Sequence, residues 1–221
     1  VDASDTVWAG TYHGVSRFVS GKWEPFARED GPAWNNVYAI VFLKDEIFFG
    51  SNQGLSVLQN GRGKTYTREN GLPDNTVLSL LVDQGRCYAG TLAGLAVLKD
   101  GELTSFDSAS GHPVTALVKM KNGTLFVGTD SGLIKSPPAP LFQRGERESL
   151  PLEKGGGEGF AHSVSSGSAE HLFIRRLGIE EGLEDLRIED LTLDAEDHLW
   201  AATQRGLCRY NGEKFICFTR D

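Results

Sequence analysis

Residues 86–98 read RCYAGTLAGLAVL, and the six-residue motif at the centre of this stretch decides the fold because it recurs along the chain. Its general form is Gly/Ala-Thr/Ser-x-x-Gly-Leu/Val. The five copies begin at Gly10, Gly50, Gly90, Gly128 and Ala202. They follow one another after 40, 40, 38 and 74 residues. A regular period of this length is the sequence signature of a repeat architecture.

The residues around each copy predict four short strands per repeat. One apolar run precedes the motif and another follows it, as in residues 125–127 (LFV) and 55–58 (LSVL), so the motif is a tight reversal between two strands. A turn dipeptide such as Asn60-Gly61 then predicts a hairpin into a further strand, because glycine tolerates positive φ. A polar loop leads to the most continuously apolar run, as in residues 77–82 (VLSLLV), which is typical of a strand buried on both faces. We name the four strands A to D, beginning with this run.

Four antiparallel strands repeated about every 40 residues predict an all-β fold, a β-propeller of about five four-stranded blades. A β-sandwich with the same number of strands would not need the repeated motif. We expect a single domain, residues 1–221, with blades that span about 1–33, 34–73, 74–111, 112–184 and 185–221. The first unit begins at the end of its strand A, so either the ring closes on a three-stranded blade or the five units are part of a larger propeller.

One long segment interrupts the pattern in the fourth unit. Residues 136–170 are rich in Pro, Gly and charge and carry almost no strand pattern. Because this segment accounts for the long last step between motif copies, we predict an insertion between strands C and D that is disordered over much of its length. The alternative is a degenerate sixth blade within residues 141–176.

Charge and hydropathy exclude two kinds of partner. The formal net charge is −8 at pH 7, and no cluster of Lys and Arg with interleaved aromatic residues stands out, so we expect no nucleic-acid partner. No stretch approaches 18 consecutive apolar residues, so we expect no membrane span in this chain.

The three cysteines show no spacing typical of zinc or thiol redox sites. Cys208 and Cys217 flank a predicted hairpin turn at Asn211-Gly212, which places them on facing strands, whereas Cys87 stands alone. A disulfide demands a specific geometry. We therefore expect ordinary buried thiols and keep a cross-strand disulfide as the alternative.

The residues that carry chemistry form no recognisable catalytic or metal motif. The five histidines lack HxH and HExxH spacing, and the acidic run 194–197 misses the calcium-loop pattern, so we expect no metal and no cofactor. A glycosidase or lyase on a propeller would bring acids from several A strands to the central axis. Only the A strand with Glu189 and Asp190 carries acids in its interior, although the loop acids Asp74, Asp130 and Glu184 could contribute. We therefore expect that the protein is not an enzyme.

Propeller geometry proposes one face for binding. The loops from strand D to the next strand A and the turns from B to C lie on the same side, around the mouth of the central channel, and loops on a rigid scaffold commonly carry function. Trp34 could stack on a sugar or peptide, and we expect Asn36 and Asn75 to cap turns before strand A. A purely structural role in its turn is the alternative for each candidate. The candidate ligand-binding residues are Tyr12, His13, Trp34, Asn35, Asn52, Gln53, Asp74, His112, Asp130, Gln204 and Arg205.

Residues 75–77 (NTV) with 88–95 (YAGTLAGL), together with 199–207 (LWAATQRGL), carry a resemblance to the two-component regulator propeller repeat family. The likeness covers the chain except for roughly residues 136–170. In that family, such repeats form propellers in the extracytoplasmic sensor regions of bacterial hybrid histidine kinases, often recognising carbohydrate-derived ligands. The resemblance therefore implies a periplasmic or extracellular sensor that binds a carbohydrate-derived or other small ligand, or a protein partner. The chain departs from the family in its five units, where seven are typical, and in the lack of a helical transmitter region.

Three functions follow from these observations. The first is a non-catalytic propeller that senses a ligand or binds a partner through the channel-mouth loops. The second is a carbohydrate-active hydrolase or lyase, which a cluster of three carboxylates in one pocket would favour. The third is a protein-interaction scaffold, which a flat apolar patch would favour.

Overall fold

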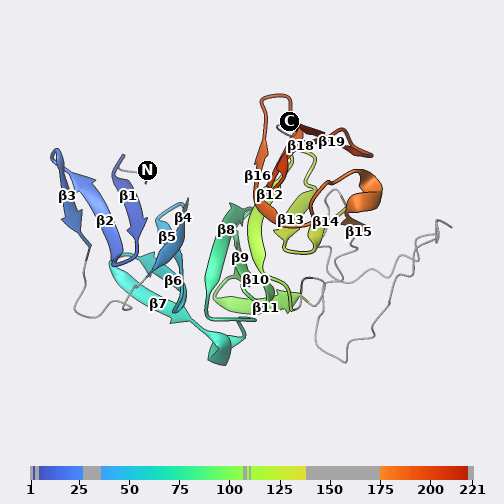
Figure 1. Ribbon diagram of the computed structural model, residues 1–221. Coiled ribbons are helices and arrows are strands. Elements are labelled where there is room, and N and C mark those ends of the chain that lie inside the picture. Colours follow the sequence, from blue (N-terminus) through green and yellow to red (C-terminus); the bar gives the residue numbers. More distant parts are fainter. Residues whose placement is uncertain are drawn as a thin grey trace.

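The computed structural model describes residues 2, 5–26, 36–106, 109, 111–137 and 175–218. Within these residues the chain forms five antiparallel sheets, in each of which the strands follow one another in sequence order (Figure 1). We call the sheets blades 1 to 5.

Blade 1 consists of β1 (Val7–Thr11), β2 (Gly14–Val19) and β3 (Lys22–Pro25). Blade 2 consists of β4 (Val37–Leu43), β5 (Glu46–Ser51), β6 (Gly54–Gln59) and β7 (Arg62–Tyr66). Blade 3 consists of β8 (Val77–Asp83), β9 (Arg86–Thr91), β10 (Gly94–Lys99) and β11 (Glu102–Phe106). Blade 4 consists of β12 (Val114–Lys119), β13 (Leu125–Thr129), β14 (Gly132–Lys135) and β15 (Arg175–Leu177). Blade 5 consists of β16 (Ile188–Leu193), β17 (Leu199–Thr203), β18 (Gly206–Tyr210) and β19 (Phe215–Phe218). Two short 3-10 turns, η1 (Arg68–Asn70) and η3 (Ile179–Glu181), precede strand A of blades 3 and 5.

The repeated motif forms the turn between strands B and C, as the sequence predicts. In blade 3 the hydroxyl of Thr91 donates to the carbonyl of Gly94 at 2.8 Å and accepts from the backbone N–H of Ala93 at 3.2 Å. Gly94 has a φ of 140°, which a residue with a side chain rarely adopts. The same hydroxyl contacts recur in all five blades, so the motif is a local device that closes each hairpin.

The first glycine of the motif allows neighbouring blades to approach closely. A Cβ atom at Gly50 would lie 2.9 Å from Cγ1 of Val77, the residue that begins strand A of the next blade. Gly10 and Gly128 meet Val37 and Ile188 in the same way. The small residue is therefore needed for packing between blades and carries no chemistry.

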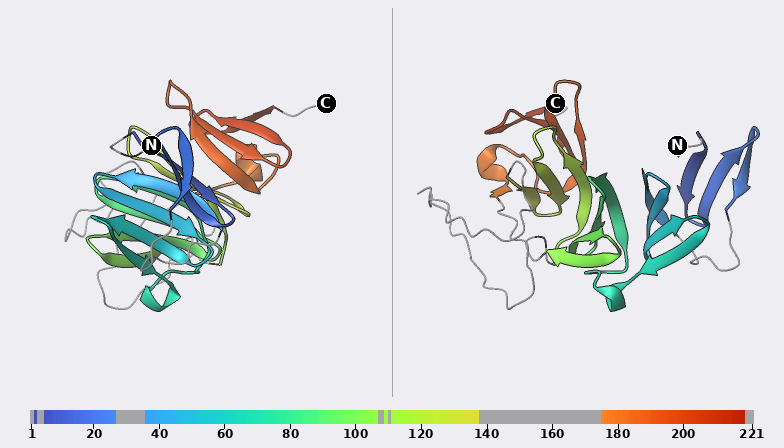
Figure 2. Two further views of the ribbon diagram at one scale, coloured as in Figure 1. Left: turned by 90° about the vertical axis from the view of Figure 1, so that its left-hand side faces the viewer. Right: turned by 180° about the vertical axis from the view of Figure 1, so that it is seen from behind.

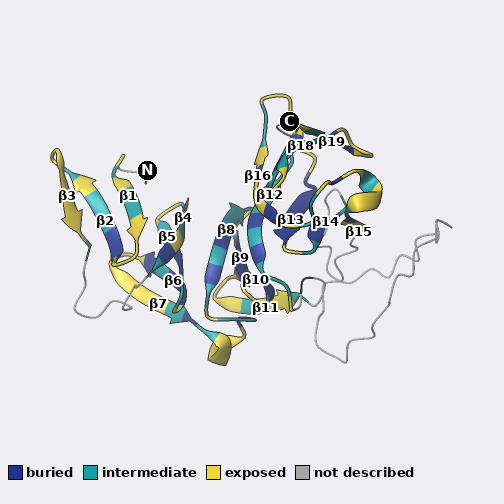
Figure 3. Cartoon of the chain, viewed as in Figure 1, coloured by how far each residue is buried: buried dark blue, intermediate teal, exposed yellow. Residues whose placement is uncertain are grey.

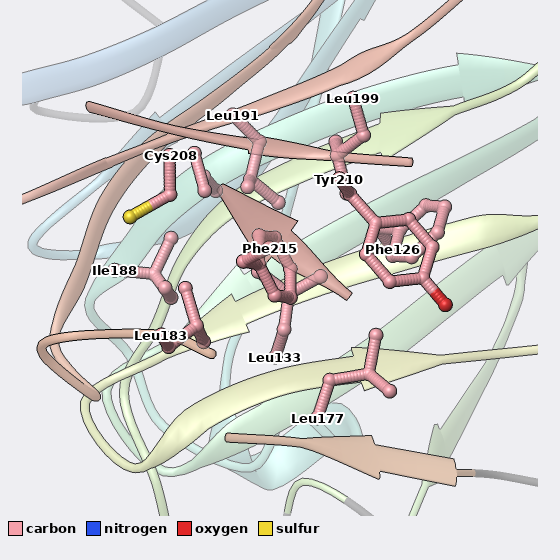
Figure 4. Close-up of a cluster of buried hydrophobic side chains, with 12 residues drawn as sticks. Phe126, Leu133, Leu177, Leu183, Ile188, Leu191, Leu199, Cys208, Tyr210 and Phe215 are labelled. Atoms are coloured by element: carbon pink, nitrogen blue, oxygen red, sulfur yellow. The ribbon is translucent and has the colours of Figure 1, made fainter. Parts of the chain in front are cut away.

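Four hydrophobic clusters hold the blades together, one between each pair of neighbours. The outer strands are mostly exposed, whereas buried residues dominate in the middle strands, where blades face each other (Figure 3). Between blades 4 and 5, Phe126 and Leu133 pack against Leu199, Tyr210 and Phe215 (Figure 4). Burial of these side chains stabilises the fold by roughly 1.5–3 kcal/mol each.

The blades form an open arc. The A strands β4, β8, β12 and β16 contact one another in that order. Blades 1 and 5 lie at the two ends of the arc, and the ring is not closed (Figures 1 and 2). The structure is therefore an all-β propeller arrangement of five blades, in which the described part of blade 1 has three strands.

Strands C and D of blade 4 pair although a long segment separates them. β14 pairs with β15 in antiparallel fashion, with Leu133 opposite Leu177. The predicted insertion 136–170 and the alternative sixth blade within 141–176 fall largely outside the described residues, which end at Pro137 and resume at Arg175. Arg175 and Arg176 belong to strand D of blade 4.

The expectation of two free thiols in blade 5 is wrong. Cys208 and Cys217 lie directly opposite each other on β18 and β19, with Cα atoms 4.0 Å apart, and form a disulfide. Directly opposed residues of an antiparallel pair bring their Cβ atoms close enough to be bridged, and the turn between these two strands sets that register. Cys87 is buried and free, and its burial raises the pKa of the thiol.

Candidate functional site

The turns between strands B and C lie beside the loops that lead into strand A, as propeller geometry predicts. The backbone N–H of Leu92 donates to the carbonyl of Thr76 at 3.0 Å, and that of Gly111 donates to Ala93 at 3.0 Å. At blade 1, the N–H of Asn36 donates to Tyr12 at 3.4 Å. The turns between strands B and C and the loops that lead into strand A together form one continuous edge of the arc, which we call the rim.

A β-bulge occurs at the second residue of each described A strand. In blade 2, Val37 pairs with Ser51 and Ala39 pairs with Gly50, so Tyr38 has no partner of its own. The same register shift occurs in blades 3, 4 and 5. Bulges redirect side chains and are frequent next to functional sites. The four bulged residues are Tyr38, Leu78, Thr115 and Glu189.

The bulged residues of blades 2 and 4 show what this shift does. Tyr38 is 45% exposed although it lies in an apolar run. Thr115 donates from its hydroxyl to the carbonyl of Ile188 at 2.6 Å and contacts that of Gly128 at 3.2 Å, so it joins blade 4 to blade 5. In blades 2 and 3 the sequence hides this change of register, because the residues around Tyr38 and Leu78 are apolar at consecutive positions.

The rim of blade 4 gathers four polar side chains in one network. Nδ1 of His112 lies 3.0 Å from Asp130 Oδ1 and 3.2 Å from Ser131 Oγ. Arg176 donates to the same Ser131 oxygen at 3.4 Å. The sequence predicts His112 and Asp130 as site residues but gives no indication of Ser131 or Arg176. Arg176 comes from a strand that follows the long insertion, so spacing in the sequence could not place it here.

This cluster lacks the geometry of a nucleophilic triad. In a Ser-His-Asp triad the serine contacts one imidazole nitrogen and the aspartate orients the other. Here Ser131 and Asp130 both contact Nδ1 of His112, so the histidine cannot accept the serine proton while the aspartate holds the opposite nitrogen. The cluster can donate hydrogen bonds to a bound ligand and accept hydrogen bonds from it.

A shallow depression of about 310 Å³ adjoins the cluster. Ser131 and Arg176 line one side of it, and η3 with its flanking residues lines the other. Glu181 of η3 accepts from the backbone N–H of Gly178 at 2.7 Å and pairs with Arg175 at 3.3 Å, which fixes this wall. A second depression, of about 430 Å³, lies at the outer strands of blades 2 and 3 and is lined by residues including Lys64 and Glu102.

The rim of blade 5 carries a smaller polar network. Glu189 Oε1 accepts from Nε2 of Gln204 and from Nε of Arg187, both at 3.1 Å. The side chain of Asp190 accepts from the backbone N–H of Leu191 at 2.8 Å. Both acids of this A strand are therefore engaged by neighbouring groups.

The remaining candidates act partly in their own turns. Asp74 accepts from the backbone N–H of Thr76 at 2.8 Å, which is a structural contact. Tyr12 is 78% exposed. Asn52 has a buried side-chain oxygen with no hydrogen-bond partner among the described residues. His13, Gln53 and Arg205 follow the motif hydroxyl and donate their backbone N–H groups to it. Trp34 and Asn35 lie outside the described residues.

Asp194, Glu196 and His198 gather at the opposite edge of blade 5, close enough to hold a cation. Their arrangement has a structural cause. Trp200 donates its indole N–H to Asp194 at 2.9 Å, and blade 1 repeats the contact between Trp8 and Asp2 at 2.8 Å without the other two groups. The hydrogen bond from Trp200 and those from His198 lower the pKa of Asp194 to about 2. We therefore regard this cluster as a capped turn.

Comparison with known proteins supports the fold. No family model matches the sequence, and a comparison with curated proteins gives no match. The chain is similar to the extracellular domain of BT3049 from B. thetaiotaomicron, described as a hybrid two-component system, with 20% identity and a TM-score of 0.72 over 99% of this chain and 28% of that one. It is also similar to the extracellular domain of BT4673 from the same organism, described as a one-component system, with 22% identity and a TM-score of 0.68 over 96% of this chain and 27% of that one.

An enzyme is also among the similar structures. An ancestral GH74 enzyme shares 16% identity with a TM-score of 0.61 over 96% of this chain and 29% of that one. At such identities the likeness shows the fold alone, which is that of a β-propeller. The chain spans less than a third of the length of each of these proteins. No helix in the described ranges is long and apolar enough to cross a membrane.

Proposed function

We propose that the protein is a non-catalytic ligand-sensing or partner-binding propeller region whose site is the rim of blades 4 and 5. The observation that carries this proposal is the cluster of His112, Asp130, Ser131 and Arg176 beside the rim depression. Fixed donors and acceptors on a rigid sheet scaffold are what a site needs to orient a polar ligand. The similarity to extracellular domains of bacterial sensor systems supports the same function.

The ligand we expect is a carbohydrate-derived or other small polar molecule. The rim offers a guanidinium, a hydroxyl, an imidazole and a carboxylate within one network, which suits a ligand with several hydroxyl groups. A periplasmic or extracellular location fits the disulfide in blade 5, since disulfides persist in oxidising compartments.

The likeness to a GH74 enzyme makes a glycoside hydrolase the second candidate. Such enzymes need two carboxyl groups about 5–10 Å apart on either side of the bond that is cleaved. Acids on the described A strands occur at Glu189 and Asp190 of β16, and at Asp83 at the far end of β8, where it pairs with Lys119. Among the described A strands, no two different strands contribute a pair of carboxyl groups at the rim. This favours binding over hydrolysis.

A thermal-shift screen of the purified chain against soluble oligosaccharides and small polar molecules tests the proposal. A ligand at 100 times its Kd should stabilise the native state by about 2.7 kcal/mol. His112→Ala and Arg176→Ala should each remove the shift caused by that ligand, whereas Lys64→Ala, at the other depression, should leave it unchanged. A ligand whose effect survives both rim variants would place the site elsewhere.

A further inference from the structure

In blades 2 to 5, the bulged residue of strand A and the third residue of the repeated motif occupy equivalent places on the rim. Blade 5 shows that their side chains meet, because Glu189 at the bulge accepts from Gln204 of the motif at 3.1 Å. Blade 2 has the same register shift, and its residues at these two positions are Tyr38 and Asn52. The rim of blade 2 therefore presents an aromatic ring beside an amide.

The side chain of Tyr38 is available for contact. The residue is 45% exposed, and within the described ranges no hydrogen bond or ring contact engages its side chain. Because Tyr38 lies on a strand held in a sheet, its ring loses little conformational entropy when a ligand covers it. A rigid, amphipathic aromatic ring of this kind is a good anchor for a ligand with an apolar surface.

Asn52 gives an independent indication of a ligand. Its side-chain oxygen is buried and has no hydrogen-bond partner among the described residues. Buried polar atoms in native proteins are nearly always hydrogen-bonded, so this unpaired oxygen carries a free-energy cost. A rotation of the amide that turns the oxygen toward a ligand hydroxyl removes this cost, and binding therefore favours it.

Blade 3 continues the apolar surface toward the polar cluster of blade 4. Its residues at the two equivalent positions are Leu78 and Leu92, and Leu92 is 44% exposed. We call Tyr38, Asn52 and Leu92 the aromatic subsite. The A strands of blades 2, 3 and 4 contact one another in that order. Sheets packed face to face lie about 10 Å apart, so one sugar ring cannot reach both Tyr38 and the blade 4 cluster.

We propose that the ligand of the rim is an oligosaccharide that extends from blade 4 to the aromatic subsite. A sugar ring has an apolar C–H face and polar hydroxyl groups at its edge. Tyr38 stacks on the C–H face of one sugar unit and Asn52 accepts from a hydroxyl of that unit, while the side chains of blade 4 bind another unit. This inference rests on the proposed function, because the cluster at His112 and Arg176 supplies the second contact.

Calorimetric titration of the purified chain with glucose-, xylose- and mannose-based saccharides of increasing length, from the monosaccharide upward, tests the proposal. The longest oligosaccharide of the series that binds should have a Kd at least about tenfold lower than that of its monosaccharide, because only a longer chain reaches both parts of the rim.

Tyr38→Ala should remove most of this gain in affinity with length, since it deletes the stacking surface. Tyr38→Phe retains the ring and should retain the gain. The matched control is Trp23→Ala, which removes a 53% exposed aromatic side chain near the turn between strands C and D of blade 1, at the edge opposite the rim. This variant should bind every saccharide as wild type does. Circular dichroism of each variant checks that it is folded.

Arg176→Ala separates failure of the aromatic subsite from failure of the proposed function. This variant should weaken the binding of every saccharide, the monosaccharide included. Binding that depends on Arg176 but changes neither with length nor in Tyr38→Ala would overturn the aromatic subsite and leave the proposed function standing. Binding that is insensitive to Arg176→Ala, or no binding of any saccharide in the series, would overturn both.

Discussion

At the scale of single residues, Gly90 tests whether the motif glycines exist for packing between blades. A Cβ at this position would lie 2.5 Å from Cγ1 of Val114 and 2.7 Å from its carbonyl oxygen. We expect Gly90→Ala to lower the free energy of unfolding by about 1–3 kcal/mol, because a backbone oxygen cannot move aside. Urea denaturation followed by fluorescence measures this change.

Ala202→Gly is the matched control for Gly90→Ala. Blade 5 has no following blade within the described residues, so the loss of this methyl group should cost no more than about 1 kcal/mol through backbone entropy. A Gly90→Ala protein that is as stable as wild type would contradict the packing explanation.

Asp194 gives the structure a pH-dependent contribution to stability. The hydrogen bond from Trp200 and those from His198 lower the pKa of Asp194 in the folded protein from 3.8 to about 2. A carboxyl group with a lowered folded-state pKa stabilises the fold above its unfolded-state pKa, and this contribution disappears as the pH falls through its folded-state pKa. The stabilisation is therefore complete above about pH 4 and is lost towards pH 2.

We expect Asp194→Asn to lower the Tm at neutral pH, with a difference from wild type that shrinks between about pH 4 and pH 2. Glu196→Gln, at the neighbouring exposed carboxylate, leaves the hydrogen bond between Trp200 and Asp194 in place and should keep a Tm close to that of wild type. A difference in Tm that stays constant down to about pH 2 would mean that the charge of Asp194 does not stabilise the fold.

At the scale of elements, the disulfide fixes the hairpin of β18 and β19. Closing a loop of about ten residues removes conformational entropy from the unfolded chain worth about 2–3 kcal/mol. The double variant Cys208→Ser with Cys217→Ser should lose stability of this order in urea denaturation. Cys87→Ser controls for the loss of a thiol that forms no bridge.

Thiol counting provides an independent check of the disulfide. Denatured but unreduced protein should react at one thiol, Cys87, because the other two are joined. Three reactive thiols would contradict the bridge between β18 and β19.

The strands, turns and their pairing show what the sequence could and could not predict. The strands, the turn motif and the adjacency of the rim loops follow from periodicity, because each unit repeats the same local chemistry. The sequence did not predict the bulge at Tyr38, since an apolar residue at this position fits either face of the strand. The disulfide was missed because pairing depends on a register that spacing alone leaves open. Ser131 and Arg176 meet through the pairing of β14 with β15 across the insertion, which no local pattern reveals.

At the scale of the whole molecule, the arc of A strands places the rim segments of neighbouring blades along one edge. The rim carries polar side chains on rigid turns, which suits recognition of a ligand.

The central claim is that the rim binds its ligand without converting it. The most direct test is to incubate the chain with a saccharide that raises its Tm and to analyse the recovered saccharide by mass spectrometry. We predict that the saccharide is recovered intact and that Arg176→Ala abolishes its effect on the Tm. Recovery of cleaved products, lost on substitution of Glu189 or Asp190, would contradict the claim and identify the protein as an enzyme.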